Sequence, residues 1–154
     1  MKAASIAEIK KQLVKLDQGE LLEIVLQLAR SKKDNKELLT YVLFLSDNEQ
    51  AYARYLCDEI DEQFRLNPNM HKKTLRKTIR VMEKCLRFSS SKETELTVRV
   101  HFCRSLMSSE TPFRDRKIMF NMYAAQLKKI RKLIEGYHED LQHDYRREFR
   151  DLDI

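Results

Sequence analysis

Apolar residues recur at three- and four-residue intervals along almost the whole chain. This is the period of an α-helix, in which residues at such spacing share one face. The pattern predicts seven helices, over residues 5–16, 18–32, 35–45, 47–66, 70–89, 91–108 and 112–150. Because the linkers between them are short, successive helices have to turn back on each other. We therefore predict an all-α fold of short antiparallel hairpins, arranged as an irregular α-solenoid-like array or an orthogonal bundle.

Most of the predicted helices begin with a recognisable capping signal. Such a signal is a residue whose side chain can accept a hydrogen bond from the first turn, followed three positions later by a glutamate. A proline that follows a threonine marks a further start, because a helix needs no N–H at its first position. The capping pairs are Ser5/Glu8, Asp17/Glu20, Asp34/Glu37, Ser46/Glu49 and Ser90/Glu93, and the proline start is Thr111-Pro112.

Two segments depart from simple amphipathic periodicity. Residues 18–32 are apolar nearly all round, which predicts a central helix. Leu96, Val98, Val100 and Phe102 alternate with polar residues, as a half-buried strand would. No partner strand is visible elsewhere in the sequence, and a lone strand would leave its backbone groups unpaired. We therefore expect this second segment to be helical as well.

The last predicted helix, residues 112–150, carries an apolar repeat close to a heptad. Unbroken, it would be about 57 Å long, whereas a compact domain of this size has a radius of gyration of about 15 Å. Three arrangements resolve this mismatch. Gly136 bends the helix, the tail lies along several other helices, or the tail binds a second chain. We expect residues 137–152 to pack on their own chain, with a dimer through the C-terminal helix as the alternative to a monomer.

Composition supports a single all-helical domain over residues 1–154. The chain has 2 glycines and 2 prolines, whereas a chain of this length has about 18 such residues on average. Folds rich in hairpins use these residues at every turn, so the shortage argues against sandwiches and barrels. Three scattered cysteines, an N-terminus without an apolar core and the lack of a long apolar run predict a cytoplasmic protein.

The charge is concentrated in the middle of the chain. Residues 67–132 hold 17 Lys and Arg against 5 Asp and Glu, while the flanking regions are net acidic. A helical projection of residues 72–87 separates an apolar face from a basic arc, and residues 114–132 carry a similar arc. These basic faces are candidate contacts with a polyanion or a partner, through Lys72, Lys73, Arg76, Lys77, Arg80, Lys84, Arg87, Lys128, Arg131 and Lys132. The opposing interpretation is that acidic residues of the preceding helix, namely Asp58, Glu59, Asp61 and Glu62, screen the basic arc across the hairpin.

Motifs for catalysis or metal binding are weak. Glu135-x-x-His138 and Asp140-x-x-His143 have the spacing of metal ligands on one helix face, but two such pairs in succession on one helix do not form the di-iron pattern. Two glycines are too few for a phosphate-binding loop, and no signature of a nucleophile is present. The sequence therefore predicts no metal and no cofactor, and it argues against an enzyme. An enzyme whose site is assembled between helices from distant residues stays open as a third alternative.

Three stretches, ELLEIVLQLARSKKDNKELLTYVLF, CDEIDEQF and YHEDLQHDYRREF, together resemble a family of small, uncharacterised bacterial cytoplasmic proteins. The resemblance is an overall pattern of helices, and it implies an all-helical domain without assigning a function. From the residues themselves, we expect a non-enzymatic protein-binding domain of the adaptor or scaffold kind. The alternative is sequence-independent nucleic-acid binding through the basic faces of residues 72–87 and 114–132. We expect no membrane partner.

Overall fold

The protein is all-helical, as the sequence predicts. The computed structural model describes residues 2–152, and the fold is 77% helical. Within these residues there are eight α-helices and no strand. The helices are α1 (Ile6–Leu13), α2 (Gln18–Ser31), α3 (Lys33–Thr40), α4 (Glu49–Leu66), α5 (Lys72–Leu86), α6 (Lys92–Ser108), α7 (Lys117–Ile134) and α8 (Glu139–Glu148). A π-helical segment, Tyr41–Leu45, follows α3, and a 3₁₀ segment, Arg150–Leu152, follows α8.

The chain divides into two compact units, and the boundary in the sequence falls between Phe44 and Leu45. The first unit contains α1, α2 and α3, and the second contains α4 to α8. The single domain over residues 1–154 stays a prediction, because two compact units can belong to one domain or to two. No helix within residues 2–152 is long and apolar enough to cross a membrane.

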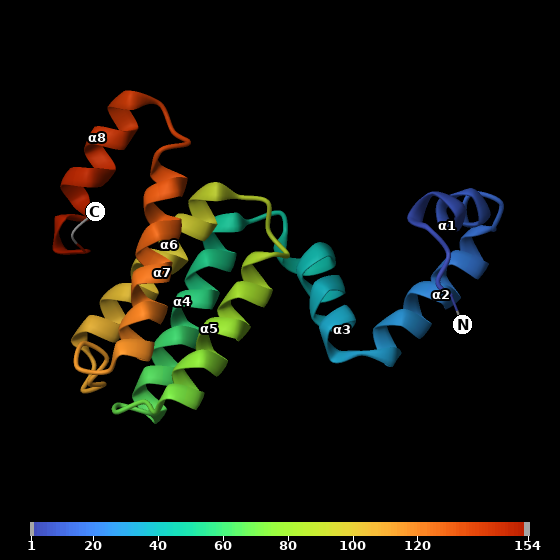
Figure 1. Ribbon diagram of the computed structural model, residues 1–154. Coiled ribbons are helices and arrows are strands. Elements are labelled where there is room, and N and C mark those ends of the chain that lie inside the picture. Colours follow the sequence, from blue (N-terminus) through green and yellow to red (C-terminus); the bar gives the residue numbers. More distant parts are fainter. Residues whose placement is uncertain (1, 153–154) are drawn as a thin grey trace. The chain divides into compact units, whose positions relative to one another are not determined.

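The second unit is built on four helices. Helix α4 packs on α5 and α6, and α7 also packs on α5 and α6. Helices α5 and α7 are therefore neighbours, and they run in the same direction (Figure 1). The side of α4 that faces the bundle is apolar, and its four large residues are buried, namely Tyr52, Leu56, Ile60 and Phe64.

The central helix of the second unit is α6. It contains the segment that alternates like a strand, and the prediction that this segment is helical is confirmed. Leu96, Val98, Val100 and Phe102 are all at most 4% exposed. The alternating pattern arises because α6 packs on both α4 and α7, so its apolar positions extend over a wide arc of the helix.

The prediction that residues 18–32 form a central helix is wrong. These residues form α2, but α2 contains no buried residue. Neither do α1 and α3, so Tyr41 is the only buried residue among residues 2–44. A wide apolar surface indicates that a helix is stabilised when other elements pack on it. It does not specify which elements those are. In the first unit, the two helices other than α2, namely α1 and α3, have eight residues each and are too short to cover it.

Two of the predicted helix starts are confirmed in detail. Ser5 and Glu8 form a reciprocal capping box at the start of α1. Asp17 and Glu20 form a second one at the start of α2. In each box the first residue accepts a hydrogen bond from the backbone of the third helical residue, whose own carboxylate accepts one in return.

Three other predicted starts are displaced by one or two residues. Helix α4 begins after Asn48, whose side chain accepts a hydrogen bond from the Ala51 amide, and the Glu49 carboxylate accepts a hydrogen bond from Thr94 of α6. Helix α6 begins after Ser91, one residue later than expected. Helix α3 begins after Lys32, without a side-chain cap, so Asp34 lies inside its first turn.

The predicted C-terminal helix over residues 112–150 is also wrong at its start. Residues 109–116 form a loop, and α7 begins at Lys117. Thr111 is buried in this loop, and its hydroxyl accepts a hydrogen bond from the amide of Met70 at 2.9 Å. Phe113 is also buried, with its ring 4.9 Å from that of Tyr123. The loop persists because it packs against the α4–α5 connection, which a helix starting at Pro112 would not allow.

The long segment breaks a second time at Gly136, one of the three arrangements expected. Helix α7 ends at Ile134, and α8 begins at Glu139. The tail then packs on its own chain, as expected, with Phe149 and Leu152 buried. Arg104 of α6 fixes it further, by donating two hydrogen bonds of 2.8 and 2.9 Å to the carboxylate of Asp151.

Candidate functional site

The structure exposes most of the basic residues that the sequence singled out on α5. The apolar face of this helix is buried through Leu75, Met82 and Leu86, so its opposite face points to solvent. The exposed basic residues at α5 are Lys72, Lys73, Arg76, Lys77, Arg80 and Arg87, and Lys84 is half-buried. The amphipathic pattern alone places these charges correctly, because only one face of the helix can be covered by the bundle.

Helix α7 adds further positive charge beside them. It contains no Asp or Glu, and the predicted contacts Lys128, Arg131 and Lys132 are all exposed. Since α5 and α7 are in contact, the structure brings the two predicted basic regions together. Two of the predicted residues, Lys84 and Arg131, already have interaction partners within the chain.

A buried ionic cluster joins these helices. Arg99 of α6 is 3% exposed, and its guanidinium donates hydrogen bonds to Glu83 of α5, Glu95 of α6 and Gln126 of α7. Lys129 of α7 donates a 2.6 Å bond to the same Glu83 carboxylate. All the partners of Arg99 therefore converge where the three helices meet.

The cluster holds Glu83 in its ionised form. Burial alone would raise the pKa of this carboxyl, but hydrogen bonds from Arg99 and Lys129 outweigh it and lower the pKa to about 2. Glu83 is the only acidic residue of α5. Its carboxylate is bonded to Arg99 and Lys129. The solvent-facing side of α5 therefore carries positive charge only.

Sequence reasoning missed Arg99, although a signal was present. Arg99 stands between the apolar residues Val98 and Val100, one turn after Glu95. A buried cation requires hydrogen-bonded anionic partners, so such an arginine indicates a local ionic cluster. The contact with Glu95 follows from the spacing, whereas those with Glu83 and Gln126 depend on how the helices pack.

The expected screening of α5 by the acidic residues of α4 is not seen as direct pairing. Asp61 instead lies 2.7 Å from the ring nitrogen Nε2 of His101. Glu62 accepts two hydrogen bonds from Arg65 of its own helix. Within residues 2–152, no ion pair joins Asp58, Glu59, Asp61 or Glu62 to a basic side chain of α5.

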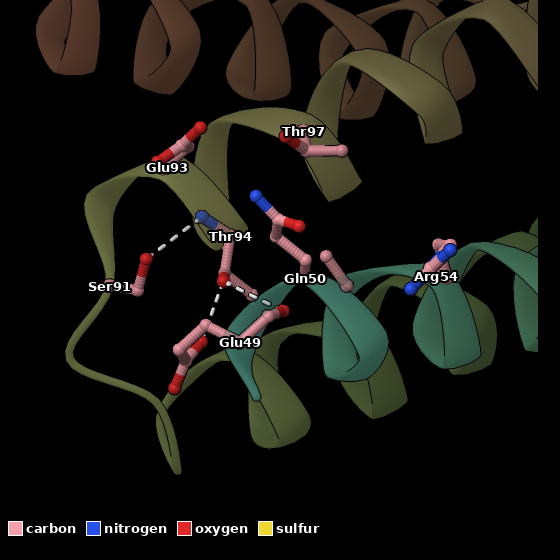
Figure 2. A pocket seen from close by; sticks show the side chains of 8 residues that line it. Glu49, Gln50, Arg54, Ser91, Glu93, Thr94 and Thr97 are labelled. Carbon is pink, nitrogen blue, oxygen red and sulfur yellow. Dashed lines mark hydrogen bonds between the residues drawn. The ribbon is translucent and has the colours of Figure 1, made fainter. Parts of the chain in front are cut away.

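A hollow of about 290 Å³ lies between the starts of α4 and α6. Figure 2 shows Glu49 at its edge, where the carboxylate accepts a 2.6 Å hydrogen bond from the hydroxyl of Thr94. Ser89 donates a second bond to this carboxylate, at 2.7 Å. Because these hydrogen bonds fasten the start of α4 to that of α6, we assign Glu49 a structural role.

A second hollow, of about 480 Å³, brings a serine, a histidine and an aspartate together. The Ser105 hydroxyl donates to Oδ1 of Asp61 at 3.1 Å, and His101 contacts the same oxygen at 2.7 Å. In a catalytic triad the histidine lies between the other two residues and accepts the serine proton. Here the aspartate occupies the central position, so the serine lacks the base that would activate it.

Of the two pairs in the tail, Asp140 and His143 lie in the same helix, α8, but Glu135 and His138 do not. Glu135 caps the end of α7, while His138 precedes α8, so these two residues do not share a helix face. His138 lies 3.5 Å from Asp140 instead. Among residues 2–152, no group of three or more potential ligands is placed to hold a metal ion.

The first unit exposes large apolar side chains. On α2, Leu22 is 56% exposed, Val25 39% and Leu28 53%. These residues are three positions apart, so they lie on one side of the helix. On α1, Ile6 is 82% exposed and Val14 74%. The sequence revealed that these residues are apolar, but only the structure shows that they are uncovered.

Comparisons with known proteins find no matching family model, curated protein or solved structure. The resemblance to small bacterial proteins is therefore unsupported by these comparisons.

Proposed function

We propose that this chain is a non-enzymatic protein-binding protein that docks another protein through the apolar side of α2. The observation that carries the proposal is the exposure of Leu22, Val25 and Leu28 in a helix without any buried residue. Removing apolar area from water is favourable by about 25 cal/mol per Å². A partner that covers these side chains therefore gains free energy that the first unit does not obtain by folding.

The spacing of the apolar residues indicates the shape of the partner. Leu21, Val25 and Leu28 follow the i, i+4, i+7 order of helices that bind in an apolar groove. The opposite side of α2 is polar and carries Glu23 and Gln27. A helix with this division can insert one side into a groove and keep the other in solvent. The partner should accordingly present an apolar groove about four helical turns long.

The proposal includes the location of the protein. Among residues 2–152, Cys57, Cys85 and Cys103 form no disulfide bond. A reducing compartment keeps thiols in this form, so the proposal places the protein in the cytoplasm.

Affinity capture with matched charge variants tests this function. The variant Leu22→Glu/Leu28→Glu adds two carboxylates on the apolar side of α2, whereas Gln27→Glu/Ser31→Glu adds two at exposed positions on its polar side. The wild-type protein should capture a defined partner from its source cells, in the presence of nuclease. The first variant should lose that partner, and the second should retain it. Circular dichroism should show equal helix content in all three proteins.

Two results would count against the proposal. Capture of the same proteins by both variants would show that the apolar side of α2 is not the docking surface. A wild-type dimer that only Leu22→Glu/Leu28→Glu dissociates, seen by light scattering, would mean that α2 binds a second copy of this chain rather than another protein.

A further inference from the structure

We propose that the second unit binds the phosphate backbone of duplex nucleic acid without reading its base sequence. The surface is the α5–α7 basic face, which we define as Lys72, Arg76, Arg80, Arg87, Lys128 and Lys132. It is distinct from the apolar side of α2, and the argument for it is independent of protein binding.

The contact between Glu83 and Lys129 fixes where this face lies. At about 100° per residue, Lys72, Arg76, Arg80 and Arg87 all project within about 60° of Glu83 around α5. On α7, Lys132 projects about 60° from Lys129. Because Lys129 bonds directly to Glu83, these residues lie along the facing edges of the two helices. The positive charges therefore form one strip instead of two separate ones.

Nothing within residues 2–152 neutralises this strip by direct contact. All six residues of the face are exposed, and none of their side chains has a hydrogen-bond or ion-pair partner there. Glu83, the one carboxylate of the two helices, already accepts hydrogen bonds from Arg99 and Lys129. Its lowered pKa of about 2 keeps it in these contacts at neutral pH. The exposed cations consequently lack an internal counter-charge in contact with them.

The chemistry of the face fits phosphates better than it fits a protein or a bilayer. Protein interfaces are anchored by aromatic and apolar residues and are poor in lysine at their centres, whereas this face consists of Lys and Arg. Binding to a membrane surface requires apolar side chains that insert into it, but Leu75, Met82 and Leu86 of α5 are buried in the bundle. Arginine side chains, by contrast, suit phosphate oxygens because each can donate two parallel hydrogen bonds.

The length and composition of the face favour a duplex over a single strand. From Lys72 to Arg87 the face extends about 22 Å, at 1.5 Å per residue. A strand of duplex carries one phosphate per about 3.4 Å, so about six phosphates lie within reach. Single-strand binding relies on aromatic rings that stack on bases. Helix α5 has no aromatic residue, and Phe120 of α7 projects about 180° away from Lys129.

Fluorescence anisotropy with a labelled 20-base-pair duplex of arbitrary sequence tests the proposal. The wild-type protein should bind with an affinity that falls steeply between 50 and 200 mM salt, with a log–log slope of about −5 for six phosphate contacts. The variant Lys72→Gln/Arg76→Gln/Arg80→Gln/Lys132→Gln should bind at least about 100-fold more weakly, with a slope reduced by between about 3 and 4. A second duplex sequence should bind equally well.

A control with the same change in net charge makes the result specific to the face. The variant Arg54→Gln/Lys92→Gln/Arg147→Gln/Arg150→Gln removes four exposed cations of the second unit outside the face. It should keep the wild-type slope within about 1. Arg80→Gln alone should lower the slope by about 1 and keep the wild-type melting temperature, which guards against a fourfold variant that fails to fold.

Three results would overturn the proposal. An equal loss of affinity in both fourfold variants would show that only net charge matters. A wild-type slope near zero would exclude phosphate contacts. Binding to phosphatidylserine-containing vesicles, or to polyglutamate, that exceeds duplex binding at equal charge concentration would assign the face to a membrane or to an acidic protein.

Discussion

The most consequential single residue is Arg99, because its charge lies in the core of the second unit. Breaking one contact of a buried ion pair is strongly destabilising, typically by about 3 to 5 kcal/mol, since the other charge stays buried without its partner. Glu83 bonds both to Arg99 and to Lys129. The stability of the α5–α6–α7 junction should therefore depend on the ionisation of Glu83.

We predict a defined pH dependence from this carboxyl group. Its pKa is lowered from 4.5 to about 2 in the folded protein, so its contribution is fully present above about pH 4.5 and is lost as the pH falls through 2. The shift corresponds to about 3 kcal/mol. Urea unfolding at several pH values should show that Glu83→Gln is less stable than the wild type at pH 7 but loses about 3 kcal/mol less on acidification. The exposed Glu110→Gln should behave as the wild type, and an equal acid loss in all three proteins would contradict the assignment.

The cysteines allow a second prediction for individual residues. Burial raises the pKa of the Cys57 thiol to about 11 and that of the Cys103 thiol to about 12. Since the thiolate is the reactive form, less than about one in a thousand of these groups is ionised at pH 8. Alkylation by iodoacetamide should be at least about 100-fold slower in the native protein than in urea, as followed by mass spectrometry. Rapid modification of Cys103 in the native state would show that its side chain is not buried between α6 and the neighbouring helices.

Among the helices, α8 depends most on packing. It has no buried residue of its own, and it is held by the aromatic stack of Tyr137, Tyr145 and Phe149 and by the ion pair between Arg104 and Asp151. Its exposed face carries Leu141, which is 46% exposed. Substitutions at the buried end of the tail should consequently lower the stability of the protein strongly, and substitutions on its exposed face should change it little.

A pair of truncations to alanine checks this at the level of the helix. Phe149→Ala removes a side chain that is 5% exposed and should cost about 3 to 5 kcal/mol. Leu141→Ala on the same helix should cost less than about 1 kcal/mol, because it loses little buried area. Deleting the chain from Tyr137 onward should cost at least as much as Phe149→Ala. Full stability of the deleted form as a monomer would show that the tail does not contribute to the core.

For the whole molecule, the two units differ in how much core they contain. Apart from Tyr41, every buried apolar residue among residues 2–152 belongs to the second unit. Isolated helices shorter than about 12 to 15 residues are marginal in water, and α1 and α3 have eight residues each. The first unit should accordingly open far more often than the second.

Hydrogen exchange measures this difference directly. Backbone amides of α6 should exchange near the rate of global unfolding, and those of α2 at least about 100-fold faster. Adding the partner proposed for α2 should slow exchange in α2 and leave α6 unchanged. If α2 in the isolated protein is protected as well as α6, its apolar side is already covered, and docking of another protein there is excluded.

The sequence alone was sufficient for the features that depend on neighbouring residues. The capping boxes at Ser5 and Asp17 follow from side chains three positions apart, and the break at Gly136 was among the arrangements expected. The exposed basic arc of α5 follows from one helical period. The start of α7, which the sequence misplaced, follows a loop that Thr111 fastens to Met70, 41 positions away.

What the sequence determined is therefore the all-α class, most of the helices and the sides on which charge accumulates, because these properties arise within one or two helical turns. The tertiary structure decided which apolar helix became central. Helices α2 and α6 both carry apolar residues over a wide side, yet only α6 has buried residues on that side. It also decided that Glu83 bonds inward to Arg99 while its basic neighbours stay exposed. Both outcomes depend on which surfaces meet, and residues distant in the sequence determine those contacts.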